Sequence, residues 1–389
     1  MPESSRIKIL AVTPYFPVSA TSYKGNSALH TLRWLKRSAE VEVICPITRY
    51  PKWLAPNAYH DVPDLTYQHP EFPTTYFEYP ALPVLTRPIN GFVCAHYLLP
   101  YVRAAKADVI LNYWLYPEGF SAVRAGHKLG IPVVVGAIGS DVRTRTDRWT
   151  IHFVRETMKQ ADAVITVSED LRQLAIGMGA PPEKTTSILN GCDTSVFFPG
   201  DRDEARCAVG FEGDGELILY AGNLIASKGL GELMDAFLGL LATRPQARLA
   251  IIGQGEYGET IKSRAALAGA QDRVLLLGRR KADGVAVWMR AADVFCLPSY
   301  SEGCPNVVVE ALSTGLPVVA TRVGGIPELV DARVGILIPP RDAAALAEAL
   351  DTALGRAWDR NQIASACRRS WEEVADKTFA VCRGVLRHG

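Results

Sequence analysis

The sequence predicts an α/β protein with two domains, each a parallel sheet covered on both faces by helices. Short runs rich in β-branched residues alternate with segments of helical periodicity along the chain, an order typical of parallel sheets. Proline, glycine and charged residues cluster in VFFPGDRD, residues 196–203, after which a second strand-and-helix series begins. A length of 389 residues also suits two domains of roughly 100–200 residues each.

Ten runs have the composition of buried strands, five before the cluster at 196–203 and five after it. We expect a first domain over 1–198, a second over 199–370, and a C-terminal helix over 371–389 that returns to the first domain. The segment 50–101 is rich in proline and aromatic residues, and it is interpreted either as a loop-rich insertion with a small core or as a surface for an acceptor or lipid. The expected strands are 7–12, 41–45, 109–111, 133–137, 163–167, 217–221, 249–252, 274–277, 294–297 and 318–321.

The overall composition excludes several classes of function. The net charge is +1, so no global field attracts the protein to nucleic acid. No apolar run approaches the roughly 20 residues that span a bilayer, and the N-terminus has no signal-peptide core. We therefore expect a cytoplasmic protein, with a peripheral position at the inner face of the plasma membrane as an alternative. Eight cysteines without a CxxC pair favour buried thiols over a metal site or disulfides.

The stretch SEGCPNVVVEALSTGLPVVAT, residues 301–321, places two carboxylates around a predicted helix start. Proline is favoured in the first helical turn and glycine just beyond the last turn, so this stretch predicts a helix over 305–314. Glu302 precedes the helix and Glu310 lies inside it. A helix start presents free backbone N–H groups that attract anions, here those around Cys304, Asn306 and Val307.

Two carboxylates beside a bound phosphate would repel it unless they contact something else. Hydroxyl groups are the natural partners, because a carboxylate accepts two hydrogen bonds from the vicinal diol of a ribose or a sugar ring. The pattern therefore predicts a nucleotide-sugar pocket, with N–H groups for a phosphate and one glutamate each for ribose and sugar. The alternative is that Glu302 caps the helix and Glu310 is a surface residue.

A second stretch, YAGNLIASKGLGELMDAF, residues 220–237, joins a strand to a helix through a glycine-containing loop. The loop includes Gly222 and Asn223, and Lys228 lies where the helix is expected to begin. A lysine in this place is well positioned to contact a phosphate, although the P-loop pattern GxxxxGK[ST] is absent. The alternative is a lysine that faces solvent at a helix start.

The stretch LAIIGQGEYGE contains a GxGxxG pattern at Gly253, Gly255 and Gly258. Dinucleotide binding would also need an acidic residue about 20 residues further on, but the next strand is followed by Arg279 and Arg280. We therefore interpret the glycines as a tight strand–helix turn near the same ligand.

Residues 201–203 form a DxD sequence, a pattern that holds a metal ion in some enzymes that transfer sugars. Here it follows the expected domain boundary, and an aspartate in that place is well suited to capping a helix. We therefore expect no metal site at this motif.

The first domain offers two candidate segments at strand ends, where open α/β sheets bind ligands. One leads into a helix at Gly25 and Asn26, and the other is AIGSDV, residues 137–142. The helix after Asn26 also carries a cationic and aromatic set that predicts either a solvated face or a contact with anionic membrane. This set is Arg33, Trp34, Lys36 and Arg37.

Taken together, these stretches resemble glycosyltransferase family 4, retaining enzymes of the GT-B fold. The resemblance runs from Arg6 to about Trp371 and is densest in the second half of the chain. Glu302 and Glu310 match the E-x7-E motif of the family, and GNLIASKG resembles its phosphate loop. MGAPPEKTTSILNGCD and LYPEGFSAVRAGHKLGIPVVVGAIGSDV resemble the branch that forms teichuronic acid and exopolysaccharides.

This resemblance implies two Rossmann-like domains around a cleft, a UDP- or GDP-sugar donor, and a saccharide or polyprenyl-linked acceptor. It implies transfer with retention of configuration and without metal or cofactor. Glu302 would bind the transferred sugar, Glu310 the ribose and Lys228 the diphosphate, while Asp141 is either an acceptor-side catalytic candidate or a helix cap. The remaining donor-side candidates are Gly222, Asn223, Gly278, Arg279, Gly303, Cys304, Pro305, Asn306 and Val307, and the acceptor-side candidates are Gly25, Asn26, Gly139 and Ser140.

Two positions depart from the family pattern. Many members have arginine where Asn223 stands and histidine where Ile138 stands. The first departure leaves Lys228 as the one cation of the phosphate loop, and the second removes a polar contact near the transferred sugar. Two other functions therefore stay open: a sugar-nucleotide epimerase of related fold, and a catalytically silent nucleotide-sugar-binding partner. Turnover with an acceptor distinguishes both from a transferase.

Overall fold

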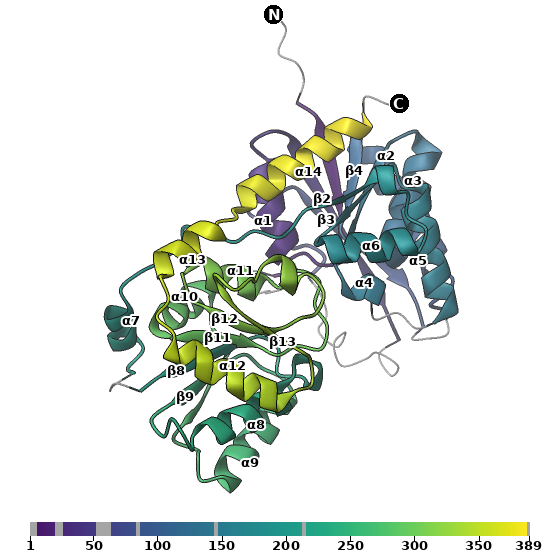
Figure 1. Ribbon diagram of the computed structural model, residues 1–389. Helices are drawn as coiled ribbons and strands as arrows, with labels where there is room; N and C mark the ends of the chain where they lie inside the picture. Colours follow the sequence, from purple (N-terminus) through teal and green to yellow (C-terminus); the bar gives the residue numbers. More distant parts are fainter. Residues whose placement is uncertain are drawn as a thin grey trace, which may run out of the picture. The chain divides into compact units, whose positions relative to one another are not determined.

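The computed structural model describes residues 6–19, 26–51, 64–82, 86–143, 147–211 and 215–386. It divides into two compact units, which Figure 1 shows as ribbons. Unit 1 holds Met1–Leu189 together with Trp371–Gly389, and unit 2 is Asn190–Ser370. Each unit has a parallel sheet with helices around it, which confirms the predicted α/β class.

Unit 1 is built on a seven-stranded parallel sheet. Its strands are β1 (Lys8–Val12), β2 (Glu40–Arg49), β3 (Thr74–Pro80), β4 (Val109–Asn112), β5 (Val133–Ala137), β6 (Ala163–Thr166) and β7 (Thr185–Ser187). They lie in the order β3-β2-β1-β4-β5-β6-β7. Every residue of the inner strands β4 and β5 is buried, as is typical of parallel strands covered on both faces.

Two helices of unit 1, α5 and α6, begin at side-chain caps. Asp147 accepts a hydrogen bond from the backbone N–H of Thr150, and Ser168 accepts one from that of Leu171, which satisfies otherwise free donors at two helix starts. The helices are α1 (Asn26–Leu35), α2 (Asn90–Ala105), α3 (Phe120–Leu129), α4 (Ser140–Arg143), α5 (Arg148–Gln160), α6 (Glu169–Gly177) and α14 (Trp371–Val385), with short turns η2 (Leu115–Gly119) and η3 (Pro182–Lys184).

The C-terminal helix α14 packs on α1 within unit 1. The rings of His30 and Trp371 are stacked with centroids 5.6 Å apart, and Arg37 forms an ion pair of 2.7 Å with Glu372. Trp371 is buried. The chain therefore passes from unit 2 back to unit 1 between Ser370 and Trp371.

Unit 2 has a six-stranded parallel sheet. Its strands are β8 (Leu217–Ala221), β9 (Arg248–Ile252), β10 (Val274–Gly278), β11 (Val294–Leu297), β12 (Val318–Thr321) and β13 (Gly335–Ile338). Its helices are α7 (Arg202–Ala208), α8 (Leu230–Leu240), α9 (Tyr257–Leu267), α10 (Ala282–Ala291), α11 (Asn306–Ser313), α12 (Ala343–Gly355) and α13 (Arg360–Ala366), with short turns η4 (Ala226–Lys228) and η5 (Ile326–Glu328).

The strand order of unit 2 defines a switch point. The strands lie as β10-β9-β8-β11-β12-β13, so the chain builds the sheet outward in one direction from β8 and in the other from β11. These two strands are neighbours through the pairs Val294↔Ile218 and Phe295↔Leu219. In open parallel sheets, ligands bind outside the carboxyl ends of the strands at such a point. In unit 1 the corresponding switch lies between β1 and β4.

All ten predicted strands are present, and their bounds agree within one residue except for β2, which continues to Arg49. The prediction missed β3, β7 and β13, which are all edge strands. Because β3 joins the main sheet and α2 follows it, part of the segment 50–101 is regular structure, which corrects the loop-rich interpretation. Residues 52–63 and 83–85 of that segment lie outside the described residues.

The units divide the chain after Leu189, earlier than the boundary expected after residue 198. The residues between are already packed on unit 2: Arg290 donates a hydrogen bond to the carbonyl of Val196, and its guanidinium lies over the ring of Phe198. None of the described helices is long and apolar enough to cross a membrane.

Candidate active site

Two residues singled out from the sequence, Lys228 and Glu302, lie together at the switch point of unit 2. Lys228 ends the turn η4 after β8, and Glu302 lies in the loop after β11. Lys228 Nζ is 2.6 Å from Glu302 Oε1, and 23% and 11% of the two side chains remain exposed. The ion pair is therefore partly shielded from water, which strengthens it relative to a surface pair. Sequence reasoning predicted both residues for the site but not their pairing.

The two loops that carry this pair approach each other closely. The backbone N–H of Tyr300 donates a hydrogen bond of 3.0 Å to the carbonyl of Ser227. Gly229 has a φ of +68°, and a Cβ atom there would lie 2.0 Å from the carbonyl oxygen of Pro298. A larger residue would force the loops apart, so this glycine is required for the distance between Lys228 and Glu302.

A third loop, which follows β12, supports Glu302 from another side. The N–H of Gly325 donates to the carbonyl of Gly303 over 2.8 Å. A Cβ atom on Gly324, whose φ is +55°, would lie 1.9 Å from the carbonyl oxygen of Glu302. Residues 302 and 303 follow β11, and their main chain is held in place by the loop that follows the neighbouring strand β12.

The helix α11 begins beside this pair. Pro305 is its N-cap residue in an extended conformation, so the helix starts one residue later than expected, and no side chain caps it. The side chain of Pro305 accepts no hydrogen bond from the first turn, and the N–H groups of a helix start can bind an anion. Gly315 follows the helix with a φ of +76°, which matches the predicted C-terminal glycine.

Asn190, which was not among the predicted site residues, holds the loop before α11. Its side-chain Nδ2 donates to the carbonyl of Cys304 over 3.1 Å and to Asn306 Oδ1 over 2.8 Å. Its backbone N–H donates to Cys304 Sγ over 3.4 Å. Asn190 is the first residue of unit 2 and lies within the family-like segment MGAPPEKTTSILNGCD. The sequence did not single it out as a site residue, because the residues that it contacts are far away along the chain.

Glu310 lies inside α11 and is half-buried. Its carboxylate has no hydrogen-bond or ion-pair partner among the described residues. Burial raises the pKa of Glu310 to about 7, because the charged form loses hydration without gaining a partner. A carboxylate in this condition is available to accept hydrogen bonds from a ligand.

The predicted phosphate loop after β8 is held by contacts within unit 2. The hydroxyl of Tyr220 donates to the carbonyl of Asn223 over 2.9 Å. Gly222 donates its N–H to the carbonyl of Ile252 over 2.9 Å. Burial raises the pKa of Tyr220, so its hydroxyl keeps the proton that it donates. The backbone of this loop is thus fixed before any ligand binds.

The glycines of the GxGxxG pattern form the neighbouring loop. A Cβ atom on Gly253 would lie 1.8 Å from the carbonyl oxygen of Gly222, and one on Gly255 would lie 2.2 Å from that of Leu224. Both have positive φ values, +149° and +157°. This confirms the interpretation as a tight strand–helix turn, in which glycine allows the backbones to touch.

Two predicted donor-side residues, Gly278 and Arg279, lie at the end of β10. Gly278 is the last residue of that strand, with a φ of +66°, and its carbonyl accepts a hydrogen bond of 3.0 Å from Gly253. Arg279 follows and is exposed. The sheet order therefore places Gly278 and Arg279 on the side of the Gly253 loop away from β8.

In unit 1, Asp141 is buried and its carboxylate bonds to the backbone. It accepts hydrogen bonds from the N–H groups of Ile138 (3.1 Å), Gly139 (2.9 Å) and Leu115 (3.4 Å). Burial raises the pKa of Asp141 to about 6, and these hydrogen bonds oppose that rise. These donors lie just after β4 and β5 and not in the first turn of α4, so the contacts differ from the helix cap that was the alternative for Asp141.

The acceptor-side candidates lie at helix starts of unit 1 where the structure describes them. Ser140 begins α4, directly after Gly139, whose φ is +124°. Asn26 begins α1, and Gly25 lies outside the described residues.

The DxD sequence serves as a helix start, as predicted. Asp201 accepts a hydrogen bond from the N–H of Glu204 and caps α7. Arg202 forms an ion pair of 2.9 Å with Asp293, and Asp203 is exposed. Nowhere in the described part of the chain do three or more His, Cys, Asp or Glu side chains form a group that could hold a metal ion.

The cationic side chains of α1 form ion pairs and hydrogen bonds with other residues of unit 1. Arg33 binds Glu71 through hydrogen bonds of 2.9 and 2.8 Å, and Lys36 donates to the carbonyl of the same residue. Arg37 pairs with Glu372 and also lies over the ring of Trp34. These partners reduce the positive charge that α1 could offer to a membrane, so the alternative of a solvated, paired face is favoured here.

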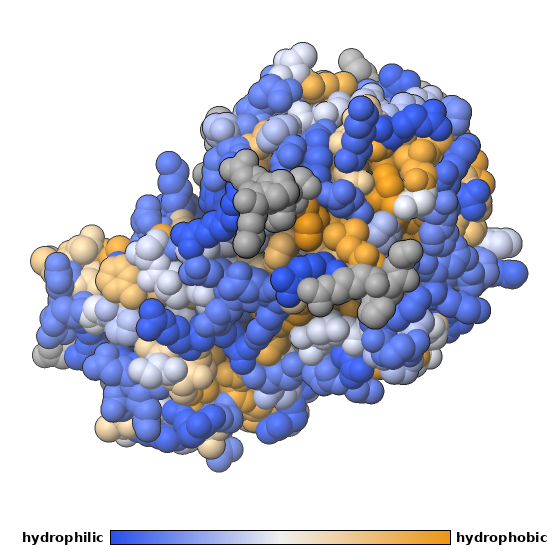
Figure 2. Space-filling view, turned by 90° about the horizontal axis from the view of Figure 1, so that it is seen from above, coloured by the Kyte–Doolittle hydropathy of each residue, from blue (hydrophilic) through white to orange (hydrophobic). Residues whose placement is uncertain are grey.

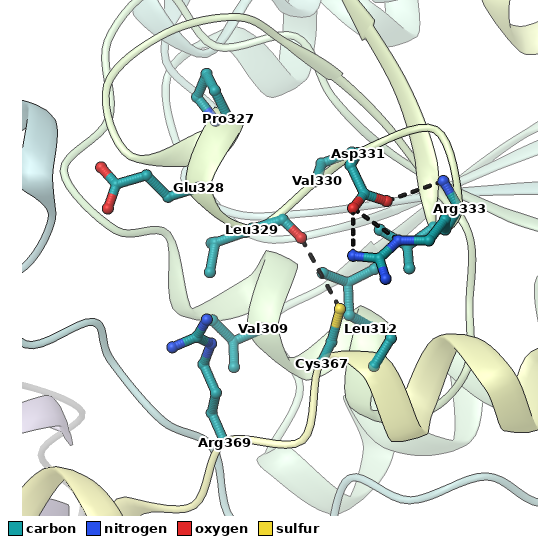
Figure 3. Close-up of a pocket in the computed structure, with 12 residues that line it drawn as sticks. Val309, Leu312, Pro327, Glu328, Leu329, Val330, Asp331, Arg333, Cys367 and Arg369 are labelled. Carbon is teal, nitrogen blue, oxygen red and sulfur yellow. Dashed lines mark hydrogen bonds and ion pairs between the residues drawn. The ribbon is translucent and has the colours of Figure 1, made fainter.

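A cavity of about 150 Å³ lies beside α11 in unit 2, and Figure 3 shows its lining. Val309 and Leu312 of α11 form an apolar part of it, and Arg369 and Glu328 lie at its edge. Cys367 Sγ contacts the carbonyl of Leu329 at 3.9 Å. None of the predicted site residues is among its lining residues, so this cavity is distinct from the pair at the switch point.

Two families of glycosyltransferases match the chain. Residues 201–370 match the family described as "Glycosyl transferases group 1", and residues 25–191 match the "Glycosyl transferase 4-like domain". Residues 201–370 form a domain of the glycosyltransferase group 1 family. The identification agrees with the predicted resemblance, which rested on the E-x7-E spacing of Glu302 and Glu310 and on the loop around Lys228.

Named relatives support the same family. This glycosyltransferase is 28% identical over 376 residues to TuaC of Bacillus subtilis, which is named as a teichuronic acid biosynthesis glycosyltransferase, and the match covers 88% of each chain. It is 34% identical over 220 residues to the D-inositol 3-phosphate glycosyltransferase of Segniliparus rotundus. That match covers 54% of this chain and 49% of the relative, so this glycosyltransferase spans about half the length of that relative.

Solved structures share the fold at low sequence identity. Sucrose-phosphate synthase of Thermosynechococcus elongatus has a TM-score of 0.78 at 20% identity, over 99% of this chain and all of that chain. HepE of Anabaena, solved in complex with UDP, has a TM-score of 0.75 at 19% identity, over 97% of this chain and all of that chain. The fold of this glycosyltransferase is thus GT-B, with two Rossmann-like units.

Proposed function

We propose that this glycosyltransferase moves a sugar from a UDP- or GDP-sugar to a saccharide or polyprenyl-linked acceptor with retention of configuration. The observation that carries the proposal is the pair of Lys228 and Glu302 at the switch point of unit 2, 2.6 Å apart and beside the uncapped start of α11. This arrangement offers positive charge and the N–H groups of a helix start to a diphosphate, and a carboxylate to the adjoining sugar.

In the proposed reaction, the bond between the anomeric carbon and the diphosphate oxygen breaks, and its electron pair leaves with the diphosphate. The acceptor hydroxyl oxygen forms the new bond on the same face, and its proton passes to an oxygen of the leaving phosphate. Lys228 and the N–H groups of Asn306 and Val307 stabilise the charge that develops on the leaving group, which is usually the largest contribution to such catalysis. Because these groups supply positive charge, we propose that transfer proceeds without a metal ion.

Donor binding requires the ion pair to separate. The diphosphate takes over Lys228, and Glu302 becomes free to accept hydrogen bonds from the hydroxyls of the sugar. Glu310, which is half-buried and unpaired among the described residues, accepts those of the ribose. Asn223 adds no positive charge where many members have arginine, so the phosphate loop contributes its fixed backbone instead.

On the acceptor side, we assign Gly139 and Ser140 to the edge of the site and Asp141 to a positioning role. Its three hydrogen bonds to backbone N–H groups leave little capacity to take a proton from an acceptor. The leaving phosphate is therefore the proton acceptor in this proposal. The same argument leaves Gly25 and Asn26 as candidates for contacts with the acceptor.

Membrane contact of unit 1 is proposed at a surface formed by α2, α3 and α5, called the α2–α3–α5 surface below. These helices carry six exposed cations and a single acidic residue, Glu156, although the whole chain has a net charge of +1. The cations are Arg103, Arg124, Lys128, Arg148, Arg155 and Lys159. Each Lys or Arg near an anionic bilayer contributes about 1 kcal/mol of attraction.

Aromatic side chains are exposed among these cations. Trp149 is 49% exposed and Phe92 is 41% exposed. Arg148 lies over the Trp149 ring at 5.1 Å, and Arg124 over the Phe92 ring at 5.0 Å. Amphipathic rings beside cations suit the interface of an anionic bilayer. Figure 2 shows that hydrophobic residues reach the molecular surface among hydrophilic ones.

A nucleotide panel followed by turnover tests the proposed function. Thermal stability is measured with UDP-, GDP- and ADP-sugars, because a ligand at 100 times its Kd adds about 2.7 kcal/mol of stability. The stabilising donor is then incubated with saccharide and polyprenyl-linked acceptors, with and without EDTA. We expect transfer that survives EDTA and a product that keeps the anomeric configuration. Inversion of a sugar centre without an acceptor would indicate the epimerase, and binding without any product would indicate the silent partner.

A further inference from the structure

Asn190 makes three hydrogen bonds that converge on the residues flanking Pro305. Nδ2 donates to the carbonyl of Cys304 and to Asn306 Oδ1, and the backbone N–H donates to Cys304 Sγ. Pro305 has no N–H group, and it caps α11 without a side-chain hydrogen bond. The turn that leads into α11 therefore depends on a residue from elsewhere in the chain for its fixed position.

The same segment also contacts the far end of α11. Cys192 Sγ lies 3.0 Å from the hydroxyl oxygen of Ser313, the last residue of that helix. Residues 190–192 thus follow α11 from its first residue to its last. The buried thiol of Cys192 has its pKa raised to about 11 by burial, so it stays protonated and acts here as a small neutral group.

Residues 190–192 also pair with the end of unit 2. The N–H of Cys192 donates to the carbonyl of Arg369 over 3.0 Å, and Cys192 forms a parallel β-bridge with Ser370. Asn190 is the first residue of unit 2 and Ser370 is the last. The two places where the chain passes between units therefore lie side by side against α11.

We propose that Asn190 is a positioning residue for the donor site, which fixes the start of α11 relative to the segment where the chain crosses between units. The inference rests on the proposed function, because it assumes that the diphosphate binds at the N–H groups of this helix start. Asn190 has no role at the reacting atoms. It keeps the first turn of α11 oriented so that the N–H groups of this turn meet the leaving phosphate without reorganisation.

The side-chain amide suits this role. Two donated hydrogen bonds require a group with two N–H bonds in one plane, which an aspartate or a hydroxyl side chain does not have. Loss of the amide would leave the carbonyl of Cys304 and Asn306 Oδ1 without these partners. The helix start would then sample other positions, and a displaced N–H group makes a weaker hydrogen bond to phosphate.

The test compares Asn190→Ala with Ser313→Ala, which releases the same segment from the other end of α11. Calorimetric titration with UDP and GDP gives the Kd, and thermal melting gives the stability of each variant. Net hydrogen-bond contributions near 1 kcal/mol correspond to an affinity loss of about 3- to 10-fold for Asn190→Ala. Ser313→Ala is expected to melt at a lower temperature with an unchanged Kd, and Asn190→Ala is expected to raise the donor KM while the acceptor KM stays constant.

Asn306→Ala provides a second route if Asn190→Ala folds poorly, because it removes the acceptor of the 2.8 Å hydrogen bond and leaves Asn190 in place. In the double variant Asn190→Ala with Asn306→Ala, the fold-loss of UDP affinity should be smaller than the product of the fold-losses of the two single variants. This is expected because the two residues act through the same hydrogen bond. A wild-type protein that binds UDP, with Asn190→Ala and Asn306→Ala binding it equally well, overturns this inference alone. A wild-type protein that binds neither nucleotide overturns the proposed function and this inference together.

Discussion

Lys228 Nζ and Glu302 Oε1 lie 2.6 Å apart across the switch point of unit 2. Without this ion pair, each of the two side chains would be a partly buried charge with no partner. The proposed donor therefore enters a site whose two main groups already bind each other. In the proposed function, the diphosphate competes with Glu302 for Lys228, and the hydroxyls of the sugar then give Glu302 new hydrogen-bond partners.

Replacement of Glu302 by glutamine should lower turnover without weakening free nucleotide. The amide keeps the shape of the side chain, but it no longer gives the hydroxyls a charged acceptor, a loss of roughly 1.5–3 kcal/mol or about 10- to 150-fold in rate. Lys228 meanwhile loses its competitor for phosphate, so UDP should bind equally well or more tightly. Calorimetry with UDP and a transfer assay measure both effects. A large loss of UDP affinity would show that Glu302 contacts the nucleotide instead.

Replacement of Glu310 by glutamine should weaken UDP and UDP-sugar alike, by about 10- to 150-fold. Both ligands contain ribose, and Glu310 is proposed to accept its hydroxyl hydrogens. Calorimetry with the two ligands tests the equality. If the variant weakened only the UDP-sugar, Glu310 would contact the sugar and the assignments of the two glutamates would be exchanged.

The same variant should stabilise the protein without ligand in neutral and alkaline solution. Burial raises the pKa of Glu310 from an ordinary 4.5 to about 7, so the folded state holds its proton more tightly than the unfolded state does. The higher pKa in the folded state contributes its full stabilisation below pH 4.5, and this stabilisation is lost as the pH rises through 7. One pKa unit corresponds to about 1.36 kcal/mol, so the rise from 4.5 to about 7 sets an upper limit of about 3–4 kcal/mol, and the effect of a half-buried side chain is smaller than this limit.

Melting temperatures of the wild type and Glu310→Gln at pH 5 and pH 8 measure this effect. The variant should melt higher than the wild type at pH 8, and the difference should shrink toward pH 5. Glu348→Gln, at an exposed position of α12, is the control and should show no such pH dependence. Equal melting temperatures at pH 8 would mean that the Glu310 carboxylate finds partners or water in the folded state.

Substitution on the α2–α3–α5 surface should reduce binding to anionic vesicles. The double variant Arg148→Glu with Trp149→Ser removes one cation, adds an acid and deletes an exposed ring. Sedimentation with vesicles of phosphatidylglycerol and phosphatidylcholine should show a fall in bound protein of roughly tenfold or more, since each lost charge changes the attraction by about 1 kcal/mol. Lys262→Glu, an exposed position in unit 2, should leave binding unchanged. Equal binding of the double variant and the wild type would remove this surface from the proposal.

Strand prediction succeeded where burial made the pattern continuous. The inner strands β5, with the sequence VVVGA, and β8, with the sequence LILYA, are buried at every position, and such runs are distinctive without any tertiary information. The missed strands β3, β7 and β13 lie at sheet edges. TTYFEYP of β3 mixes buried and partly exposed residues, so its composition resembled that of an aromatic loop.

Single residues of the candidate site could be predicted where a charged side chain lies in a loop directly after a strand. Lys228 and Glu302 each follow a strand, and the ends of parallel strands meet at one edge of a sheet. The ion pair between them was not predictable, because 74 residues separate them along the chain and only the strand order places β8 beside β11. Asn190 was missed for the same reason, since its three hydrogen bonds reach across 114 and 116 residues.

The most direct test of the central claim is a UDP titration of Lys228→Ala beside Glu302→Gln, with Lys262→Ala as an exposed-lysine control. If the switch point of unit 2 binds the diphosphate, the two halves of one ion pair should act in opposite directions on UDP affinity. Lys228→Ala removes the cation and leaves the Glu302 carboxylate to repel phosphate, so we expect a loss of about tenfold to a hundredfold. Glu302→Gln should bind UDP as well as the wild type or better, and Lys262→Ala should bind it unchanged. Wild-type affinity for UDP in Lys228→Ala would contradict the account, because the lysine would then serve only to pair with Glu302.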